Sequence, residues 1–179
     1  RQMCIRDRFI VGGLSGVSHA VSPSDFQQQD TYYIVAHLHY VLFGGSIVGI
    51  FAGTYYWFPK ITGKMLDETL GKLNFWLVFI GMNLTFFPMH FTGLAGMPRR
   101  IPDYALQFSD FNMVSSIGAG LLGLTQVLCL YIVIKTIRGG EKATAQVWEG
   151  AEGLEWTIPS PAPLHTFSTP PVISDGDEH

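Results

Sequence analysis

The sequence predicts an all-α membrane protein, a polytopic transmembrane helix bundle with a Pro-rich extended C-terminal tail. Of its 179 residues, 47% are hydrophobic and only 14% are charged, which is typical of membrane proteins. Residues 32–58 contain no Asp, Glu, Lys or Arg and exceed the roughly 20 apolar residues that a membrane-crossing helix needs. Beyond about Gly139 the composition shifts to Pro and acidic residues, which cannot bury a core.

Four apolar stretches predict four spans, at about 9–21, 32–58, 73–94 and 111–137. The first is read as the second half of a span, because its small residues suit close helix packing but it is short. The octet before it, residues 1–8, carries three Arg and one Asp. We interpret it as a foreign or misread end of a truncated reading frame, to be left out of fold reasoning.

The connections between the spans carry turn signals and charges. S-P-S-D, which begins at Ser22, predicts a turn, and Pro59 after an interfacial Trp57 predicts the end of the second span. The loop after that span and the segment after the last one are rich in cations: Lys60, Lys64, Lys72, Lys135, Arg138 and Lys142. By the positive-inside rule these segments, and the tail 139–179, face the cytoplasm.

Two histidines, His37 and His39, lie one residue apart in the second span. At about 100° per residue, positions i and i+2 of a helix point to opposite faces, so one metal ion cannot bind both rings. An imidazole inside a membrane needs a hydrogen-bond or metal partner. The spacing favours two separate partners, such as a haem on each face, and leaves open two structural histidines that bond neighbouring helices.

The stretch around them, D-T-Y-Y-I-V-A-H-L-H-Y-V-L, resembles the signature of subunit I of the haem-copper oxidases, specifically the cytochrome c oxidases. The similarity continues through W-F-P-K-I-T-G, N-L-T-F-F-P-M-H-F-T-G-L-A-G-M-P-R-R and L-E-W, and covers about residues 9–137. It implies that the chain is the C-terminal part of a larger subunit. Tyr40 favours a cytochrome c oxidase, because quinol-oxidising relatives more often have Asn there.

The resemblance implies a haem ligand at each histidine. His37 would be the axial ligand of a high-spin haem of the a3 type, and His39 an axial ligand of a low-spin haem of the a type. The ligands of copper B would lie outside this chain. We therefore assign no catalytic residue within it and expect the chain alone to be inactive.

The resemblance also implies roles for charged residues near the outer face. Arg99 and Arg100 would bind the haem propionates, and Asp25 would lie in the same propionate region. Asp30 would take part in a Mg²⁺ site, although Gln29 stands where the family has His. An amide oxygen suits Mg²⁺, which prefers oxygen ligands.

For the complete subunit, the resemblance implies reduction of oxygen to water with electrons from cytochrome c, coupled to proton pumping. Expected partners are oxidase subunits II and III, cytochrome c and the lipid bilayer, in a bacterial plasma membrane. The formal charge of −3 and the lack of a Lys/Arg run give no basic surface for nucleic acid. Three alternatives remain: a haem-copper quinol oxidase, a di-haem electron-transfer protein without oxygen chemistry, and a haem-free transporter or structural subunit.

Overall fold

The computed structural model describes residues 2–151 and 153–171, with side chains from residue 9 onward. These residues are mainly helical and contain two isolated β-bridges but no strand, which confirms the predicted all-α class. Three helical stretches, Tyr32–Thr62, Glu68–Leu94 and Leu106–Gly139, are long and apolar enough to cross a membrane. A shorter apolar helix covers Phe9–Ala20.

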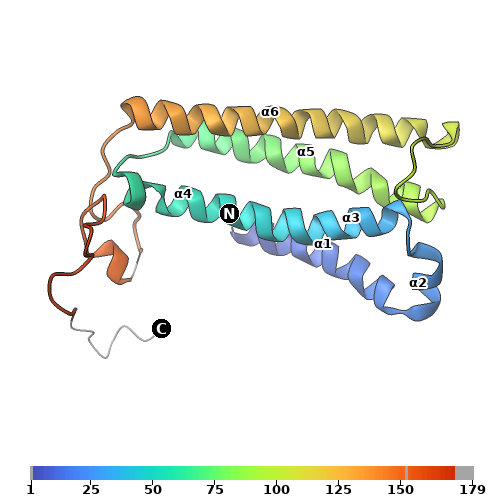
Figure 1. Cartoon of the computed structure of the whole chain (residues 1–179), viewed down its shortest axis with the longest axis horizontal. Coiled ribbons are helices and arrows are strands. Elements are labelled where there is room, and N and C mark those ends of the chain that lie inside the picture. Colours follow the sequence, from blue (N-terminus) through green and yellow to red (C-terminus); the bar gives the residue numbers. More distant parts are fainter. Residues whose placement is uncertain (1, 152, 172–179) are drawn as a thin grey trace. The chain divides into compact units, whose positions relative to one another are not determined.

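The chain divides into two compact units. The first comprises Arg1–Ala52 and Lys72–Cys129, and the second comprises Gly53–Gly71 and Leu130–His179. The helices shown in Figure 1 are α1 (Gln2–Ala20), α2 (Ser22–Gln28), α3 (Tyr32–Val41), the π-helical η1 (Leu42–Ile47), α4 (Val48–Thr62), α5 (Glu68–Leu94), η2 (Leu106–Phe108), α6 (Ser109–Gly139) and η3 (Leu154–Trp156). Helices α4, α5 and α6 contribute residues to both units.

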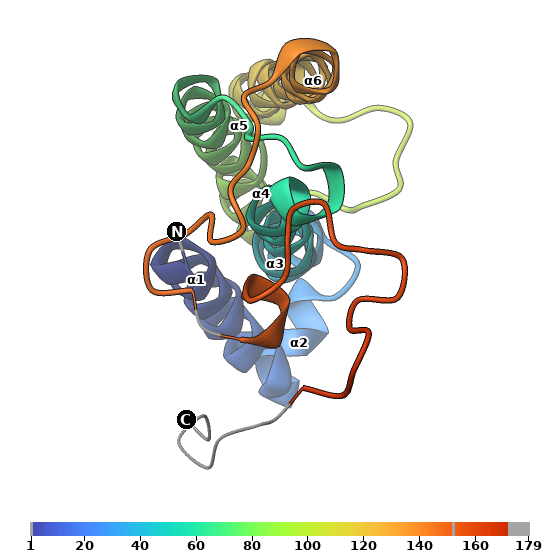
Figure 2. The ribbon, with the colours of Figure 1, turned by 90° about the vertical axis from the view of Figure 1, so that its left-hand side faces the viewer.

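In the first unit, α1 lies along α3, as Figure 1 and Figure 2 both show. Gly12 permits this approach, since a Cβ there would lie 2.8 Å from Val41 Cγ2. Gly118 plays the same part between α6 and α5, where a Cβ would lie 2.5 Å from the Thr85 backbone nitrogen. Small residues are the usual means of close helix packing in membranes, where no hydrophobic force drives helices together.

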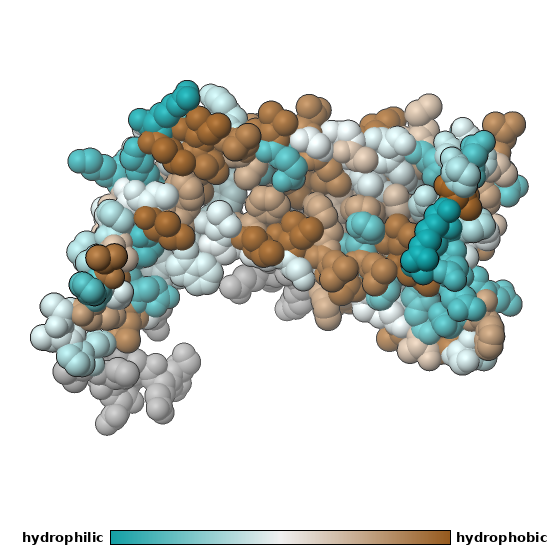
Figure 3. Space-filling view, viewed as in Figure 1, coloured by the Kyte–Doolittle hydropathy of each residue, from teal (hydrophilic) through white to brown (hydrophobic). Residues whose placement is uncertain are grey.

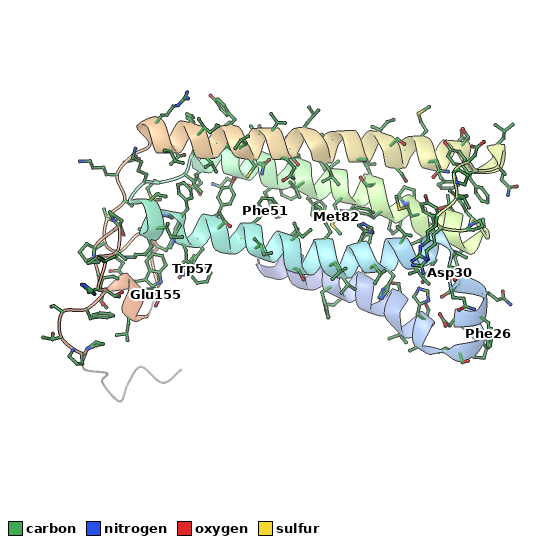
Figure 4. The ribbon with its side chains drawn as sticks, viewed as in Figure 1. Phe26, Asp30, Phe51, Trp57, Met82 and Glu155 are labelled. Atoms are coloured by element: carbon green, nitrogen blue, oxygen red, sulfur yellow. The ribbon has the colours of Figure 1, made fainter. Side chains whose placement is uncertain are left out.

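The core of the first unit is a cluster of Tyr40, Met82 and Phe86. Met82 is fully buried and lies on the side of α5 that meets α3 (Figure 4). The Tyr40 hydroxyl donates a hydrogen bond of 2.7 Å to Asn83 Oδ1. The cluster therefore joins α3 to α5 on the face of α3 that does not contact α1.

Two local expectations differ from the structure. Residues 22–28 form the short helix α2 rather than a turn, because Pro23 falls in its first turn, where proline favours a helix start. The second span continues through Pro59 to Thr62. The Thr62 hydroxyl donates to the Phe58 carbonyl and the Gly63 N–H donates to the Pro59 carbonyl, so the turn that follows the proline is hydrogen-bonded although Pro59 itself donates no bond.

In the second unit, the tail is extended as predicted, and it packs against the end of α4. Trp148 Nε1 donates to the Tyr56 carbonyl at 2.9 Å. Lys60 is only 5% exposed and donates to the carbonyls of Ala145 and Ile158 at 3.1 and 2.7 Å. Trp156 and Ile158 are buried. The tail thus has a fixed attachment to its own chain.

Two predicted segments are only partly described. Helix α1 begins at Gln2, and the foreign or misread origin of residues 1–8 stays a prediction. Arg1 and the acidic end, residues 174–179, lie outside the described residues.

Candidate functional site

His37 projects from α3 toward α1, where its Nδ1 has two partners. It lies 2.8 Å from the Gly12 carbonyl oxygen and 2.8 Å from Ser15 Oγ. The Ser15 hydroxyl itself donates to the same Gly12 carbonyl at 2.8 Å. A carbonyl can only accept, so the contact places the imidazole proton on Nδ1 and leaves the Nε2 lone pair available to a metal.

The His37 ring is also held by the shape of α1. Gly16 lies against it, and a Cβ at that position would be 2.9 Å from His37 Cε1. From the sequence alone, Gly12, Ser15 and Gly16 are expected only to allow close helix packing. They are in addition the residues that orient the ring, and their spacing along one helical face, i, i+3 and i+4, is the signal that could have identified them.

His39 projects from α3 toward α5. Its ring stacks on Phe86 with centroids 4.2 Å apart and an interplanar angle of 17°. Its Nδ1 lies 2.8 Å from the Val35 carbonyl oxygen, one turn earlier in the same helix. By the same reasoning the proton lies on Nδ1 and Nε2 can accept a metal.

The two histidines thus contact different helices, as their spacing predicts. In each ring Nδ1 lies against a backbone carbonyl, which is the usual arrangement of metal-ligating histidines. The described residues contain no group of three or more His, Cys, Asp or Glu able to hold a metal ion. Two separate one-histidine sites, of the kind that haem iron uses, fit this donor set.

Asp30 and Arg99 form an ion pair at the beginning of α3. Arg99 Nη2 lies 2.6 Å and Nε 2.8 Å from Asp30 Oδ1. The chain segments are also joined by the bridge between Thr31 and Pro98. Figure 4 shows Asp30 where α2 gives way to α3. The sequence did not predict this pair, which occupies one oxygen of the carboxylate expected at a Mg²⁺ site.

Arg100 and Asp25 take no part in the ion pair between Asp30 and Arg99. Arg100 is exposed and has a positive φ of 63°, and no ion pair of Arg100 is recorded among the described residues. Asp25 Oδ1 lies 3.4 Å from Nδ1 of His19, a histidine to which the sequence assigned no role. Hydrophilic side chains gather over α2 and its junction with α3, whereas the flanks of the helices are mainly hydrophobic (Figure 3).

Comparison with known proteins agrees with these features. The family described as Cytochrome C and Quinol oxidase polypeptide I matches residues 8–121. The chain is 44% identical over 167 residues to cytochrome c oxidase subunit 1 of Bacillus sp. (strain PS3), covering 92% of the chain and 27% of that protein. It is 48% identical over 168 residues to cytochrome c oxidase subunit 1 of Thermostichus vulcanus, covering 94% of the chain and 30% of that protein.

A solved structure of a heme-copper terminal oxidase dimer has a similar fold. The match has a TM-score of 0.69 at 22% identity and covers 78% of this chain and 26% of that one. The chain therefore spans less than a third of the length of the relatives it matches. Because the family model matches more than half of the chain, the chain belongs to the family of cytochrome c and quinol oxidase polypeptide I, the subunit I family of the haem-copper oxidases.

Proposed function

We propose that the chain is the part of a cytochrome c oxidase subunit I that holds one axial ligand of each of two haems. His37 binds a high-spin haem of the a3 type and His39 a low-spin haem of the a type. The observation that carries the proposal is the pair of imidazoles on opposite sides of α3, each with Nδ1 bonded to a carbonyl. When bound, the haems supply iron that accepts electrons and, at the high-spin site, binds oxygen.

The chain's own residues prepare these two ligands. The Gly12 carbonyl and the Ser15 hydroxyl fix the tautomer and the direction of the His37 ring. The Val35 carbonyl and the Phe86 ring do the same for His39. Backbone acceptors of this kind make the coordinating nitrogen more basic, which favours binding of a metal at Nε2.

Arg99 and Arg100 bind the carboxylates of the haems in this proposal. A guanidinium has five N–H donors, and the contact with Asp30 uses only the Nε and Nη2 nitrogens of Arg99. Arg99 therefore has donors left for a second carboxylate, and Arg100 has all of its own. Asp25 lies in the same region, and a Mg²⁺ ion at Asp30 would have to share the carboxylate with Arg99.

The complete enzyme would reduce oxygen to water with electrons from cytochrome c and pump protons, using copper B held by residues outside this chain. It would work with oxidase subunits II and III in a bacterial plasma membrane, with the tail in the cytoplasm. The choice of cytochrome c over a quinol rests on Tyr40, which is buried and bonded to Asn83, and on the names of the relatives.

A reduced-minus-oxidised spectrum of the membrane complex that contains the chain tests the proposal. We expect two haems, one of which shifts its band with carbon monoxide, and faster reduction by cytochrome c than by a quinol. If no haem bands appear, the proposal is wrong, and a haem-free transporter or structural subunit is the alternative that remains. Two haems without a carbon monoxide shift would mean electron transfer without oxygen chemistry, and reduction by quinol alone would assign the donor to the other branch of the family.

A further inference from the structure

His19, near the end of α1, has a half-buried ring whose nitrogens make no hydrogen bond within the described residues. Its side chain is 14% exposed, and both ring nitrogens are inaccessible and unbonded within the described residues. Asp25 Oδ1 lies 3.4 Å from Nδ1, the distance of a loose ion pair, so Nε2 is the ring nitrogen that has no polar partner in the described part of the chain. Buried polar groups in folded proteins nearly always have a partner, so each exception calls for one.

The position of His19 relative to His37 indicates which group this partner is. Gly12, Gly16 and His19 follow one another on the face of α1 that meets α3, and the first two contact Val41 and His37. The His19 ring lies 5.4 Å from the His37 ring between centroids. A large flat group held at His37 Nε2 would have the neighbours of that ring within its reach, and His19 is one of them.

The other polar neighbours of His19, Tyr33 and Ser18, already form hydrogen bonds with other groups. Tyr33 meets the His19 ring edge-on, with centroids 5.0 Å apart, and its hydroxyl lies 3.1 Å from Ser18 Oγ. The Ser18 hydroxyl in turn donates to the Ser15 carbonyl at 2.7 Å. Within the described residues, these neighbours offer His19 ring contact but no hydrogen bond.

His19 also lies at the polar end of the unit. It is close to Asp25 of α2, and hydrophilic side chains gather over α2 in Figure 3. A haem has one edge with two carboxylates and an otherwise apolar outline. Carboxylates are costly in an apolar environment, so the polar edge of a haem on His37 would point toward this end, where His19 is the imidazole next to the ligand.

We propose that His19 is a haem-contact residue, whose ring N–H donates a hydrogen bond to a carboxylate of the haem held by His37. This inference rests on the proposed function of His37. A neutral imidazole always carries one N–H and one acceptor nitrogen, so the contact requires no change of protonation. His19 would thus be a third hydrogen-bond donor for the haem carboxylates, from α1, beside Arg99 and Arg100, which follow α5.

The test compares three variants in the membrane complex that contains the chain. His19→Leu removes the ring nitrogens, His19→Gln retains an amide N–H near the position of Nε2, and Ser18→Ala is the matched control on the adjacent residue. Redox-difference infrared spectra, with the haem carboxylates labelled with ¹³C, report the hydrogen bonding of those carboxylates. A redox titration reports the midpoint potential of the haem that reacts with carbon monoxide.

We expect His19→Leu to shift one labelled carboxylate band and to make the midpoint potential more negative. His19→Gln should retain most of the parent values, and Ser18→Ala should leave both unchanged. If His19→Leu leaves the carboxylate bands and the midpoint potential unchanged while the haem still reacts with carbon monoxide, the proposed role of His19 is wrong. The proposed function of His37 is not affected by that result. Failure of the parent complex to show a carbon monoxide-reactive haem would overturn the proposed function itself. If His19→Leu does not assemble, His19→Phe, which keeps an aromatic ring without nitrogens, takes its place with the same expected and contradicting results.

Discussion

Arg99 and Asp30, 69 residues apart in the chain, are joined through both their side chains and their backbones. The guanidinium contacts Asp30 Oδ1 at 2.6 and 2.8 Å, and the Arg99 N–H donates to the Asp30 carbonyl at 2.9 Å. Asp30 adopts a left-handed φ of 57° to make these contacts. The beginning of α3 is thereby fixed to the segment after α5.

Because Arg99 is paired with Asp30, a substitution of Arg100 tests the binding of haem propionates without also breaking this ion pair. Arg100→Gln should lower the midpoint potential of one haem, because loss of a cation near a carboxylate disfavours the added electron, while the contact between Arg99 and Asp30 stays. Redox titration measures this shift. An unchanged potential in both Arg100→Gln and Arg99→Gln would mean that the arginines face lipid headgroups.

Arg99→Gln should also lower the potential, with only a small loss of stability. The Asp30 side chain is 72% exposed, and exposed ion pairs typically contribute about 0.2–1 kcal/mol. Thermal melting of Arg99→Gln and Asp30→Asn should therefore differ little from the parent. A loss well above about 1 kcal/mol in both variants would show that the pair is a main support of the fold.

Gly16→Ala should disturb the His37 ligand. The added Cβ would lie 2.9 Å from His37 Cε1, and turning the ring away breaks its hydrogen bond to Gly12, at a cost of about 1 kcal/mol. We expect less carbon monoxide-reactive haem per protein. Gly13→Ala is the control, because its Cβ would meet nothing within 4 Å and both variants gain the same helix propensity. Equal haem content in the two would contradict the assignment.

Lys60→Met should release the tail from the end of α4. The substitution removes two hydrogen bonds to the carbonyls of Ala145 and Ile158 and the cation that lies 5.1 Å above the Trp156 ring. Hydrogen bonds to a charged group are worth about 1.5–3 kcal/mol each. Limited proteolysis should then cut residues 145–162 faster.

Lys64→Met is the control for this experiment. Lys64 Nζ bonds the Ile137 carbonyl in an exposed setting and has no recorded contact with residues 145–162 in the described part of the chain. Equal cleavage rates in Lys60→Met and the parent would show that the two tryptophans, rather than the lysine, hold the tail.

Asp67 should stay ionised below the ordinary pKa of an aspartate. The hydrogen bond from Lys135 at 2.7 Å, followed by one from the Leu70 N–H, holds the pKa of Asp67 below its ordinary value of 3.8. Because the pKa is lower in the folded state, the ionised carboxylate stabilises the fold above pH 3.8, and this is lost as the pH falls through the lowered value. NMR titration of the carboxyl should show a higher pKa in Lys135→Met. Titration of parent Asp67 at or above the ordinary value would refute the pairing.

The sequence predicted the features that depend on local spacing. The uncharged run around His37 and His39 predicted a long helix, and their separation predicted rings that contact different neighbours. Both follow from helical geometry alone. The identity of those neighbours, Gly12 and Phe86, could not be predicted, because it depends on which helices pack together.

The features that the sequence did not predict depend on distant partners. Pro59 reads as a helix end until the hydrogen bonds around it are known. Lys60 is expected to be a loop cation, and only the folded tail shows that it bonds the carbonyls of Ala145 and Ile158, which lie 85 and 98 residues away in the sequence. The sequence assigns no role to His19, since the lack of a hydrogen bond at its ring is visible only once its neighbours have been placed.

Optical spectra of His37→Ala and His39→Ala in the assembled membrane complex show whether the two histidines hold different haems. We predict that His37→Ala abolishes the carbon monoxide-reactive haem and keeps much of the low-spin band, whereas His39→Ala does the reverse. An unchanged carbon monoxide spectrum in His37→Ala, or loss of the same band in both variants, would contradict the assignment of one haem to each face of α3.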